Sequence, residues 1–371
     1  MLYTMNDSIF RIQSIDRNLI HWEDHLLDLS PCEKIGGMWF KREDFFAPLG
    51  FGGINGSKLR VCIWLINEAL KQGAKGVSHG AVIGSPQHPM VACIAAHYNV
   101  PVIDCIGTKK PLEHETLATA AWMGAEFRSF NPGFAATLNS KAEQIAKELR
   151  YFHLETNITV DQEKNPAARV EAFHKVGSVQ VQNIPDHIEN IIVPAGSCNS
   201  VTSVLYGIAQ YRPKNLQNVI LMGIGSCGSS DPTYIHRRLQ IIEGVSGVNS
   251  QDMFGWFLNY KHNNPSQSAA TWPRKFSPIY TLTHYDVNGG CGQCKKCEGG
   301  YCTYNDLMPY RFNDLDFHPR YEGKMMCFMG DHLSEFQQYL NDKTLFWIVG
   351  SKPSAAAMAP VLKEKFGDFY E

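Results

Sequence analysis

The sequence lacks both a long apolar run and an excess of charge of one sign. No stretch of about 18 or more apolar residues occurs in the chain, so it has no candidate transmembrane helix. With 34 Lys and Arg against 36 Asp and Glu, the formal net charge is −2, which argues against nucleic-acid binding through overall charge. Residues 1–17 lack the apolar core of a signal peptide. We therefore expect a cytoplasmic protein with no membrane partner.

The apolar content is sufficient for a large core. Hydrophobic residues make up 44% of the 371 residues, and no internal repeat or low-complexity tract interrupts them. From residue 58 onward, runs rich in β-branched residues alternate with amphipathic stretches; residues 59–72 are expected to form a helix and residues 100–106 a strand. This alternation is typical of parallel strands joined by crossover helices, so the predicted fold class is α/β.

The pattern breaks down between about residues 249 and 313. This stretch is rich in Asn, Ser, Tyr, Trp, Gly and Cys and shows little periodicity. Because structureless segments of this length are uncommon inside compact domains, we interpret it as a functional insertion. A periodic pattern of apolar residues returns after this stretch, and it predicts a helix over 325–340 and a strand over 344–349.

The most informative segment, residues 39–60, reads WFKREDFFAPLGFGGINGSKLR. A predicted strand leads into a loop with four glycines, and Ser57 and Lys58 then begin a predicted helix. The positive end of the helix dipole disfavours an ammonium group at this position. Lys58 is therefore a candidate nucleophile for a Schiff base; the alternative is an ordinary solvated lysine in a first helical turn.

The order Lys-x-Glu-Asp, glycine-rich loop, Gly-x-Lys-x-Arg resembles the cofactor-lysine segment of the fold-type II pyridoxal 5′-phosphate (PLP) enzymes, the family of the tryptophan synthase β subunit. The resemblance implies two open, twisted, mostly parallel sheets flanked by helices, to which the cysteine-rich insertion would be added. It also implies PLP as the cofactor, bound as a Schiff base on Lys58.

A second segment, residues 191–207, reads IIVPAGSCNSVTSVLYG. An apolar strand is followed by a loop of small residues and a helix, and backbone N–H groups with serine hydroxyls at such a helix start can bind a phosphate dianion. A turn of this kind is also common as a purely structural feature. In the family, the cofactor phosphate binds in such a loop at this place in the chain order. The resemblance therefore assigns the phosphate to Gly196, Ser197, Cys198, Asn199 and Ser200.

The third segment is GSPQH, residues 84–88, again between a predicted strand and a predicted helix. It resembles the family loop that binds the substrate carboxylate on backbone N–H groups and places an amide beside the ring hydroxyl of the cofactor. The resemblance assigns the carboxylate to Ser85, Gln87 and His88, with Ser85 also catalytic. An Asn is usual where this loop has Pro and Gln, so Gln87 or Asn55 is the candidate for the ring-hydroxyl contact. The alternative is an ordinary Ser-Pro turn that enters a helix.

Two further segments lie near the C-terminus. DFHPRYEGKMM, residues 316–326, is similar to a segment of the branch that contains 1-aminocyclopropane-1-carboxylate deaminase and D-cysteine desulfhydrase, which makes Tyr321 a candidate catalytic residue facing the substrate. A buried tyrosine with a satisfied hydroxyl is the alternative. TLFWIVGS, residues 344–351, resembles the last core strand of the family, whose terminal hydroxyl faces the pyridine nitrogen, a role for Ser351. A neutral hydroxyl there leaves the ring nitrogen less protonated than an Asp partner would, and the electron sink weaker.

The resemblance covers nearly the whole chain, and it implies both a division into domains and a mechanism. Residues 1–60 and 165–371, with the insertion at about 249–313, are predicted to form the large PLP-binding domain, and residues 61–164 the small domain that binds the substrate carboxylate. The implied chemistry is displacement of Lys58 from its Schiff base by the substrate amino group, loss of a group from Cα or beyond, and proton transfer through Lys58.

Four of the 11 cysteines lie within a dozen residues, in the pattern Cys-x2-Cys-x2-Cys-x4-Cys. Two-residue gaps let neighbouring thiolates converge on one tetrahedral ion, so we expect a structural zinc. An iron–sulfur cluster and free or redox thiols are the alternatives, although the last gap of four residues, followed by Thr303, differs from the ferredoxin pattern. The predicted ligands are Cys291, Cys294, Cys297 and Cys302.

Three functions fit these features. The first is PLP-dependent deaminase or lyase chemistry on a small free amino acid, as in the branch named above. The second is the same cofactor chemistry, for example decarboxylation, on an amino-acid group carried by a modified nucleotide in phage DNA, for which a metal-bound insertion would reshape the entrance. The third is a catalytically inactive binding protein, against which Lys58, Ser85 and Tyr321 argue. The family also implies a homodimer.

Overall fold

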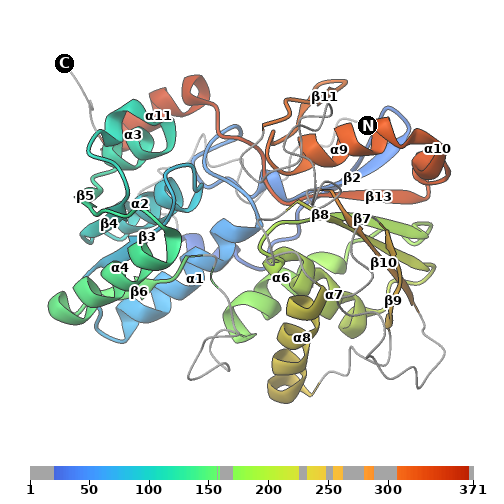
Figure 1. The fold of residues 1–371 in the computed structure, drawn as a ribbon, viewed down its shortest axis with the longest axis horizontal. Helices are drawn as coiled ribbons and strands as arrows, with labels where there is room; N and C mark the ends of the chain where they lie inside the picture. Colours follow the sequence, from blue (N-terminus) through green and yellow to red (C-terminus); the bar gives the residue numbers. More distant parts are fainter. Residues whose placement is uncertain are drawn as a thin grey trace. The chain divides into compact units, whose positions relative to one another are not determined.

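The chain forms two compact units, both of α/β architecture (Figure 1). The computed structural model describes residues 21–156, 158, 170–224, 232–247, 254–261, 280–287 and 307–366. Unit 1 takes in the described parts of Met1–Leu26, Phe46–Thr159 and Pro353–Glu371, and unit 2 those of Leu27–Phe45 and Val160–Lys352. Among the described helices, none combines the length and the apolar character that a membrane crossing needs.

By their contacts, residues 46–60, which include Lys58, belong to unit 1 together with the C-terminal helix. The reason is packing, because the helix that carries Lys58 lies against the second helix and the last strand of that unit. The predicted assignment of both segments to a large PLP-binding domain stays a prediction.

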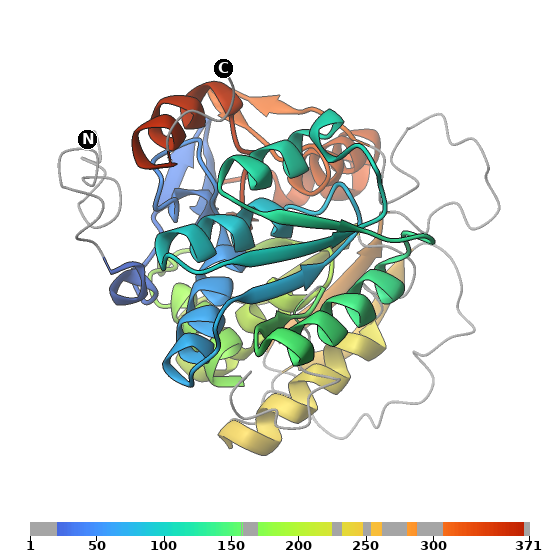
Figure 2. The ribbon, with the colours of Figure 1, turned by 90° about the vertical axis from the view of Figure 1, so that its left-hand side faces the viewer.

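Unit 1 is built on a four-stranded parallel sheet in the order β5-β4-β3-β6, whose strands run side by side in Figure 2. Its elements are η3 (Trp22–His25), α1 (Ser57–Lys71), β3 (Val77–Gly80), α2 (Gln87–His97), β4 (Val102–Ile106), η5 (Pro111–Glu113), α3 (Glu115–Trp122), β5 (Glu126–Ser129), α4 (Ala135–Leu149), β6 (Phe152–Leu154) and α11 (Ala355–Phe366). The chain steps outward from β3 to β5 and then returns to the other side of β3 as β6. Right-handed crossovers therefore place α4 on the sheet face opposite to α2 and α3.

Alternation along β4 determines which side chains meet which helix. Ile103 and Cys105 pack against Leu138 and Ile145 of α4. Because successive side chains of a strand point to opposite faces, Asp104 points away from α4, toward the face covered by α2.

Unit 2 contains a seven-stranded sheet in the order β1-β2-β13-β7-β8-β10-β9. Only the pair β1 and β2 is antiparallel among the strand pairs of this sheet in the described residues. The elements are β1 (Cys32–Ile35), β2 (Met38–Arg42), η4 (Glu43–Phe45), a π-helical segment (Val170–Lys175), α6 (Val176–Ser178), η7 (Val179–Val181), β7 (Asn190–Ala195), α7 (Asn199–Tyr211), β8 (Asn218–Gly223), α8 (Pro232–Ser246), β9 (Phe254–Lys261), β10 (Tyr280–Asp286), β11 (Arg311–Phe312), β12 (Leu315–Asp316), α9 (Glu322–Asp331), α10 (Leu333–Phe336), η9 (Gln337–Tyr339) and β13 (Thr344–Ile348).

Both faces of the large sheet are buried along its central strand β7. On β7, Ile191 and Val193 join a core with Leu205 of α7, whereas Ile192 joins a second core with Met325 and Phe328 of α9. Strands buried on both faces carry continuous apolar runs, which is why the sequence of β7 predicts this strand so well.

Two strands correct the predicted extent of the insertion. β9 and β10 lie within residues 249–313, yet they extend the sheet in parallel beyond β8. β10 reads YTLTHYD: threonine and tyrosine favour strands but contribute little to an apolar pattern, so hydrophobic periodicity missed it. The predicted helix over 325–340 is also wrong in extent. It breaks at His332, whose φ of −114° and ψ of 36° leave the helical region and whose ring lies 2.9 Å from the carbonyl oxygen of Phe328.

Candidate active site

Lys58 lies in the first turn of α1, as the sequence predicts. The preceding loop uses Gly50, Gly52 and Gly56 at φ values of 98°, 80° and 101°, a region that favours glycine, and Gly56 caps the helix. The Lys58 side chain is half-buried, and its Nζ has no hydrogen-bond or ion-pair partner among the residues that the structure describes. The amine is therefore available for chemistry.

The segment around Lys58 is fixed from two sides. The Gly56 N–H donates to the carbonyl of Phe46 at 3.0 Å, and the guanidinium of the buried Arg60 lies 3.9 Å from the Phe46 ring centroid. Arg60 also donates to the carbonyls of His25 and Leu26 at 3.2 and 3.1 Å. The helix start that carries Lys58 is thus anchored to the aromatic core of unit 1.

Asn55, a candidate for the ring-hydroxyl contact, is buried directly before this helix. Its Nδ2 donates to the carbonyl of Gly53 at 2.7 Å, which closes a tight turn in the loop. The amide therefore has a structural task here, and its contact with a cofactor stays a prediction.

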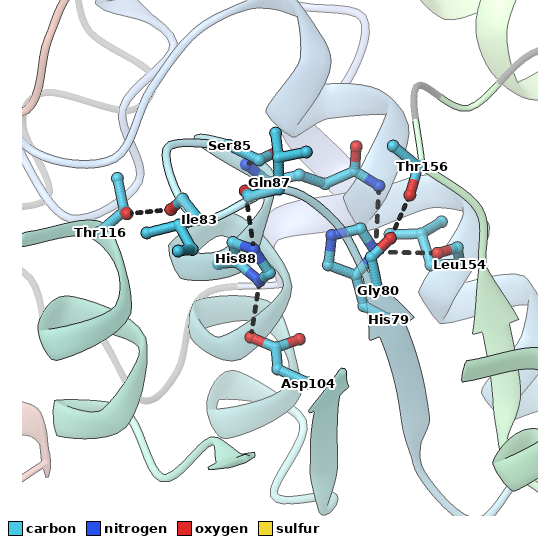
Figure 3. Close-up of polar contacts among 11 residues, drawn as sticks. His79, Gly80, Ile83, Ser85, Gln87, His88, Asp104, Thr116, Leu154 and Thr156 are labelled. Atoms are coloured by element: carbon cyan, nitrogen blue, oxygen red, sulfur yellow. Dashed lines mark hydrogen bonds and ion pairs between the residues drawn. The ribbon is translucent and has the colours of Figure 1, made fainter. Parts of the chain in front are cut away.

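Residues 82–87, which we call the Ser85 loop, connect β3 to α2 (Figure 3). The Ser85 N–H donates to the carbonyl of Val82 at 2.9 Å, and the Ser85 hydroxyl accepts the N–H of Gln87 at 3.3 Å. From α3, the Thr116 hydroxyl donates to the carbonyl of Ile83 at 2.7 Å. The first N–H groups of α2 have no acceptor within the helix, so this loop is suited to a carboxylate.

The side chains of Gln87 and His88 point into the interior of unit 1 (Figure 3). Gln87 Nε2 donates to the carbonyl of Glu155 at 2.8 Å. The His88 ring lies between Asp104 and Val82, with Nδ1 3.1 Å from Asp104 Oδ2 and Nε2 3.2 Å from the Val82 carbonyl oxygen. Both side chains are therefore engaged inside unit 1, and the contact of these two residues with a substrate carboxylate stays a prediction.

Two further buried polar residues, His79 and Asp104, lie next to Gln87 and His88 and were not predicted from the sequence. They are register partners on β3 and β4, both fully buried, so they share the sheet face that meets α2. His79 Nδ1 lies 2.9 Å from the carbonyl oxygen of Leu154 and must donate to it, which leaves Nε2 as a bare acceptor without a partner among the described residues. Burial, aided by the charges of His88 and Lys58, holds the pKa of His79 well below its ordinary value. Burial also raises the pKa of Asp104, against the opposing effect of His88.

In unit 2, the predicted phosphate loop lies between β7 and α7. Cys198 adopts a left-handed conformation at φ 62°, and α7 begins at the next residue. Asn199 Nδ2 donates to the Ser197 hydroxyl at 3.1 Å, and the buried Arg238 of α8 donates to the Ser197 carbonyl. Ser197 and Ser200 are partly exposed at the helix start. Arg238, which the sequence analysis missed, brings a positive charge to a loop suited to a phosphate.

Tyr321 lies against the same loop. A Cβ added at Gly196 would be 3.2 Å from Tyr321 Cε1, so the ring packs on the glycine. Tyr321 directly precedes α9 and is half-buried, with its ring centroid 4.8 Å from that of His318. The structure therefore brings together two of the segments that the sequence separates by more than a hundred residues.

Glu322 is the second residue that the sequence analysis missed in unit 2. Its carboxylate is fully buried; Oε1 accepts the N–H of Val349 at 2.7 Å, and Oε2 has no partner among the described residues. Burial raises the pKa of Glu322 to about 8, against the opposing hydrogen bonds of its own backbone and of Val349 and Gly350. A carboxyl group that can hold a proton thus contacts Val349, the residue that follows β13 and lies two residues before Ser351 in the chain.

The four clustered cysteines, Cys291, Cys294, Cys297 and Cys302, lie outside the described residues. Within the part of the chain that the structure describes, no group of three or more His, Cys, Asp or Glu residues could hold a metal ion. The zinc site stays a prediction.

The fold of this chain is similar to that of known proteins. No protein-family model matches this chain. The fold is similar to the crystal structure of an ACC deaminase homologue, with a TM-score of 0.58 at 16% identity over 93% of this chain and 100% of that one. In sequence, 135 residues are 29% identical to the 1-aminocyclopropane-1-carboxylate deaminase of Burkholderia lata, a match that covers 32% of this chain and 37% of that protein.

A match over almost the full length establishes the family. This chain is 35% identical to a phage enzyme over an alignment 401 positions long, which covers 96% of this chain and 89% of that protein. The chain therefore belongs to the fold-type II PLP-dependent enzymes that act on amino-acid groups. The phage relative is the O-seryl-dTMP PLP-dependent decarboxylase of Salmonella phage ViI.

Proposed function

We propose that this protein is a PLP-dependent decarboxylase that acts on an amino-acid group carried by a nucleotide. The observation that carries the proposal is the 35% identity to the O-seryl-dTMP decarboxylase over 96% of the chain. The similarity to the deaminase extends over only 32% of the chain. Of the functions that the sequence suggests, the comparisons thus favour the second over deamination of a free amino acid.

The described residues fit PLP. The start of α7, with partly exposed serines and a buried arginine nearby, suits the phosphate dianion. Oε2 of Glu322, which has no partner among the described residues, would suit the pyridine nitrogen, as would the hydroxyl of Ser351. The amine of Lys58 is half-buried and has no partner in the part of the chain that the structure describes, as the aldehyde requires, and Asn55 or Gln87 would contact the ring hydroxyl.

Decarboxylation breaks the bond from Cα to the carboxyl carbon, leaves the electron pair on Cα and then adds a proton there. PLP, when bound, supplies the sink for that electron pair. The Ser85 loop binds the carboxylate and so fixes the direction of the bond that breaks. Lys58 is the candidate proton donor to Cα, and Tyr321, beside the phosphate loop, is a second group that can position or move a proton.

Labelled substrate tests the reaction. With O-seryl-dTMP labelled in the serine carboxyl group, we expect the purified enzyme to release labelled carbon dioxide and no ammonia. Lys58→Ala should reduce the rate by about 10³-fold or more, whereas Lys71→Ala, at an exposed lysine of the same helix, should not. Release of ammonia, or no turnover, would contradict the proposal.

A second candidate function is deamination of a small free amino acid. The 135-residue match to the Burkholderia deaminase favours it. Ammonia released from a free amino acid, with no carbon dioxide from O-seryl-dTMP, would select this function instead.

We also propose that Cys291, Cys294, Cys297 and Cys302 bind one structural zinc ion. The spacing of four thiols that can share a tetrahedral ion supports this. Metal analysis should find about one zinc per chain in the wild type and none in Cys294→Ser. Cys327→Ser, a change at a cysteine outside the cluster, is the matched control and should keep the metal. An unchanged zinc content in Cys294→Ser would contradict the site.

A further inference from the structure

We infer that the buried pair of His88 and Asp104 is a latch that positions the Ser85 loop for the substrate carboxylate. The inference rests on the proposed function, since it takes this loop to bind the carboxylate of an amino-acid group. Neither residue is assigned a catalytic role, because their side chains touch only the interior of unit 1 (Figure 3).

A single oxygen atom connects the latch to the loop. The carbonyl oxygen of Val82 lies 3.2 Å from His88 Nε2 and also accepts the N–H of Ser85 at 2.9 Å. A carbonyl can only accept, so Nε2 carries a proton and donates it. The ring of His88 therefore holds the same atom that closes the turn around Ser85.

Asp104 keeps this donor in place. Its Oδ2 lies 3.1 Å from His88 Nδ1, and both side chains are 0% exposed. Because Nε2 already bears a proton, Nδ1 either donates to an ionised Asp104 or accepts from a protonated one. In both forms one proton lies between the two groups, and the Nε2 proton stays directed at Val82. Asp104 is itself held in the middle of β4, so the latch is built on a rigid element.

A second tether acts on the next residue of the loop. The Thr116 hydroxyl of α3 donates to the carbonyl of Ile83 at 2.7 Å. The C=O and N–H of one peptide unit point in opposite directions. Two consecutive carbonyls held from outside the loop therefore fix the peptide planes between Val82 and Gly84, and with them the position of Ser85, which follows directly.

Stability alone does not account for this pair. Two ionisable groups without exposure carry a desolvation cost, and replacing buried ion pairs by apolar residues is often neutral or stabilising. Positioning of the Ser85 loop does account for the His88–Asp104 pair, because two apolar side chains could not donate a hydrogen bond to the Val82 carbonyl.

Two substitutions of equal polarity separate positioning from packing. In His88→Gln, the amide nitrogen reaches about as far as ring Nε2 and keeps the donor to Val82. In His88→Asn, the shorter amide reaches only about as far as Nδ1, so it keeps Asp104 and loses Val82. The readouts, on the holoenzyme, are the KM of O-seryl-dTMP and the inhibition constant of its decarboxylated amine, which lacks the carboxylate.

For His88→Asn we expect the KM of O-seryl-dTMP to rise about tenfold or more, the equivalent of one hydrogen-bonded contact, while the inhibition constant of the amine stays within about threefold. His88→Gln keeps the donor to Val82 but loses the contact with Asp104, so we expect a smaller rise in the KM than for His88→Asn, with the inhibition constant of the amine again within about threefold. Equal effects of the two substitutions, or a parallel rise of both constants, would overturn the latch. A wild-type enzyme that does not turn over O-seryl-dTMP would instead contradict the proposed function, and the latch with it.

A second pair keeps the inference testable if His88 variants fold poorly. Thr116→Val removes the donor to Ile83 at a half-buried position, and we expect a severalfold rise in KM with the amine constant unchanged. Thr119→Val, on the same helix, removes only a hydroxyl that donates to the carbonyl of Glu115 within α3. It should change neither constant, and equal KM values for the two threonine variants would refute the tether.

Discussion

Burial decides the charge of the Glu322 carboxyl group. With one oxygen on the Val349 N–H and the other without a described partner, burial raises the pKa of this group to about 8. The side chain therefore carries a proton at neutral pH, at the strand end that leads to Ser351. With PLP bound as proposed, a pyridine ring that contacts this carboxyl group would be a stronger electron sink than one that contacts the Ser351 hydroxyl alone. The sequence predicted a role for Ser351 but not for Glu322, because a single glutamate in a helix belongs to no recognisable motif or periodic pattern.

Glu322→Gln should change how stability depends on pH. The folded-state pKa of about 8 exceeds the ordinary value of 4.5, so the contribution of Glu322 to stability is fully present below pH 4.5 and is lost as the pH rises toward 8. The loss is at most about 1.4 kcal/mol per pH unit in this window. Glutamine does not titrate, so urea unfolding of the cofactor-free proteins at pH 5 and pH 8 should show a smaller decline for the variant. Parallel declines would contradict the assignment.

Gly196→Ala should act through Tyr321. The new Cβ would lie 3.2 Å from Tyr321 Cε1, closer than ordinary contact, so the ring must move by a few tenths of an ångström. We expect kcat to fall about tenfold with little change in thermal stability, since small displacements of a reacting group are costly. Gly330→Ala, in α9 with open space at its Cβ, is the control and should leave kcat unchanged while stabilising the helix by about 0.5–1 kcal/mol. Equal kcat values for the two variants would contradict the contact.

At the scale of elements, α1 shows how a motif residue can serve the fold and not the chemistry. Arg60 completes the Gly-x-Lys-x-Arg pattern, yet its guanidinium is buried on Phe46 and donates to two carbonyls of the preceding segment. The motif thus predicts the position of Lys58 because it predicts the whole anchored helix start. Strands rich in β-branched residues and helices with apolar spacing were predictable for the same reason, whereas β10, with its threonines and tyrosines, was not.

Arg60→Ala should destabilise unit 1. It leaves the carbonyls of His25 and Leu26 without this donor and removes the contact with Phe46, which together correspond to roughly 2–4 kcal/mol. Lys71→Ala, which removes an exposed pair with Glu68 at the other end of α1, should stay within about 0.5 kcal/mol of wild type. Urea unfolding measures both, and similar losses would show that Arg60 is not an anchor.

At the scale of the whole molecule, both units contribute candidate residues. Unit 1 carries Lys58 and the Ser85 loop, and unit 2 carries the phosphate loop, Tyr321 and Ser351. Motifs in chain order predicted these segments, since each joins a strand to a helix and has a recognisable composition. His79, Asp104, Arg238 and Glu322 were not predictable, because each is a lone polar residue whose role depends on buried neighbours far away in the sequence.

The central claim, that Lys58 holds PLP, has a direct test. Borohydride reduction fixes the cofactor permanently to the lysine that carries it, and peptide mass mapping then locates it. We predict that the modification falls on the peptide that contains Lys58 in the wild type and in Lys71→Ala, and that Lys58→Ala shows none. A modification on another lysine, or a wild-type protein without any, would contradict the account.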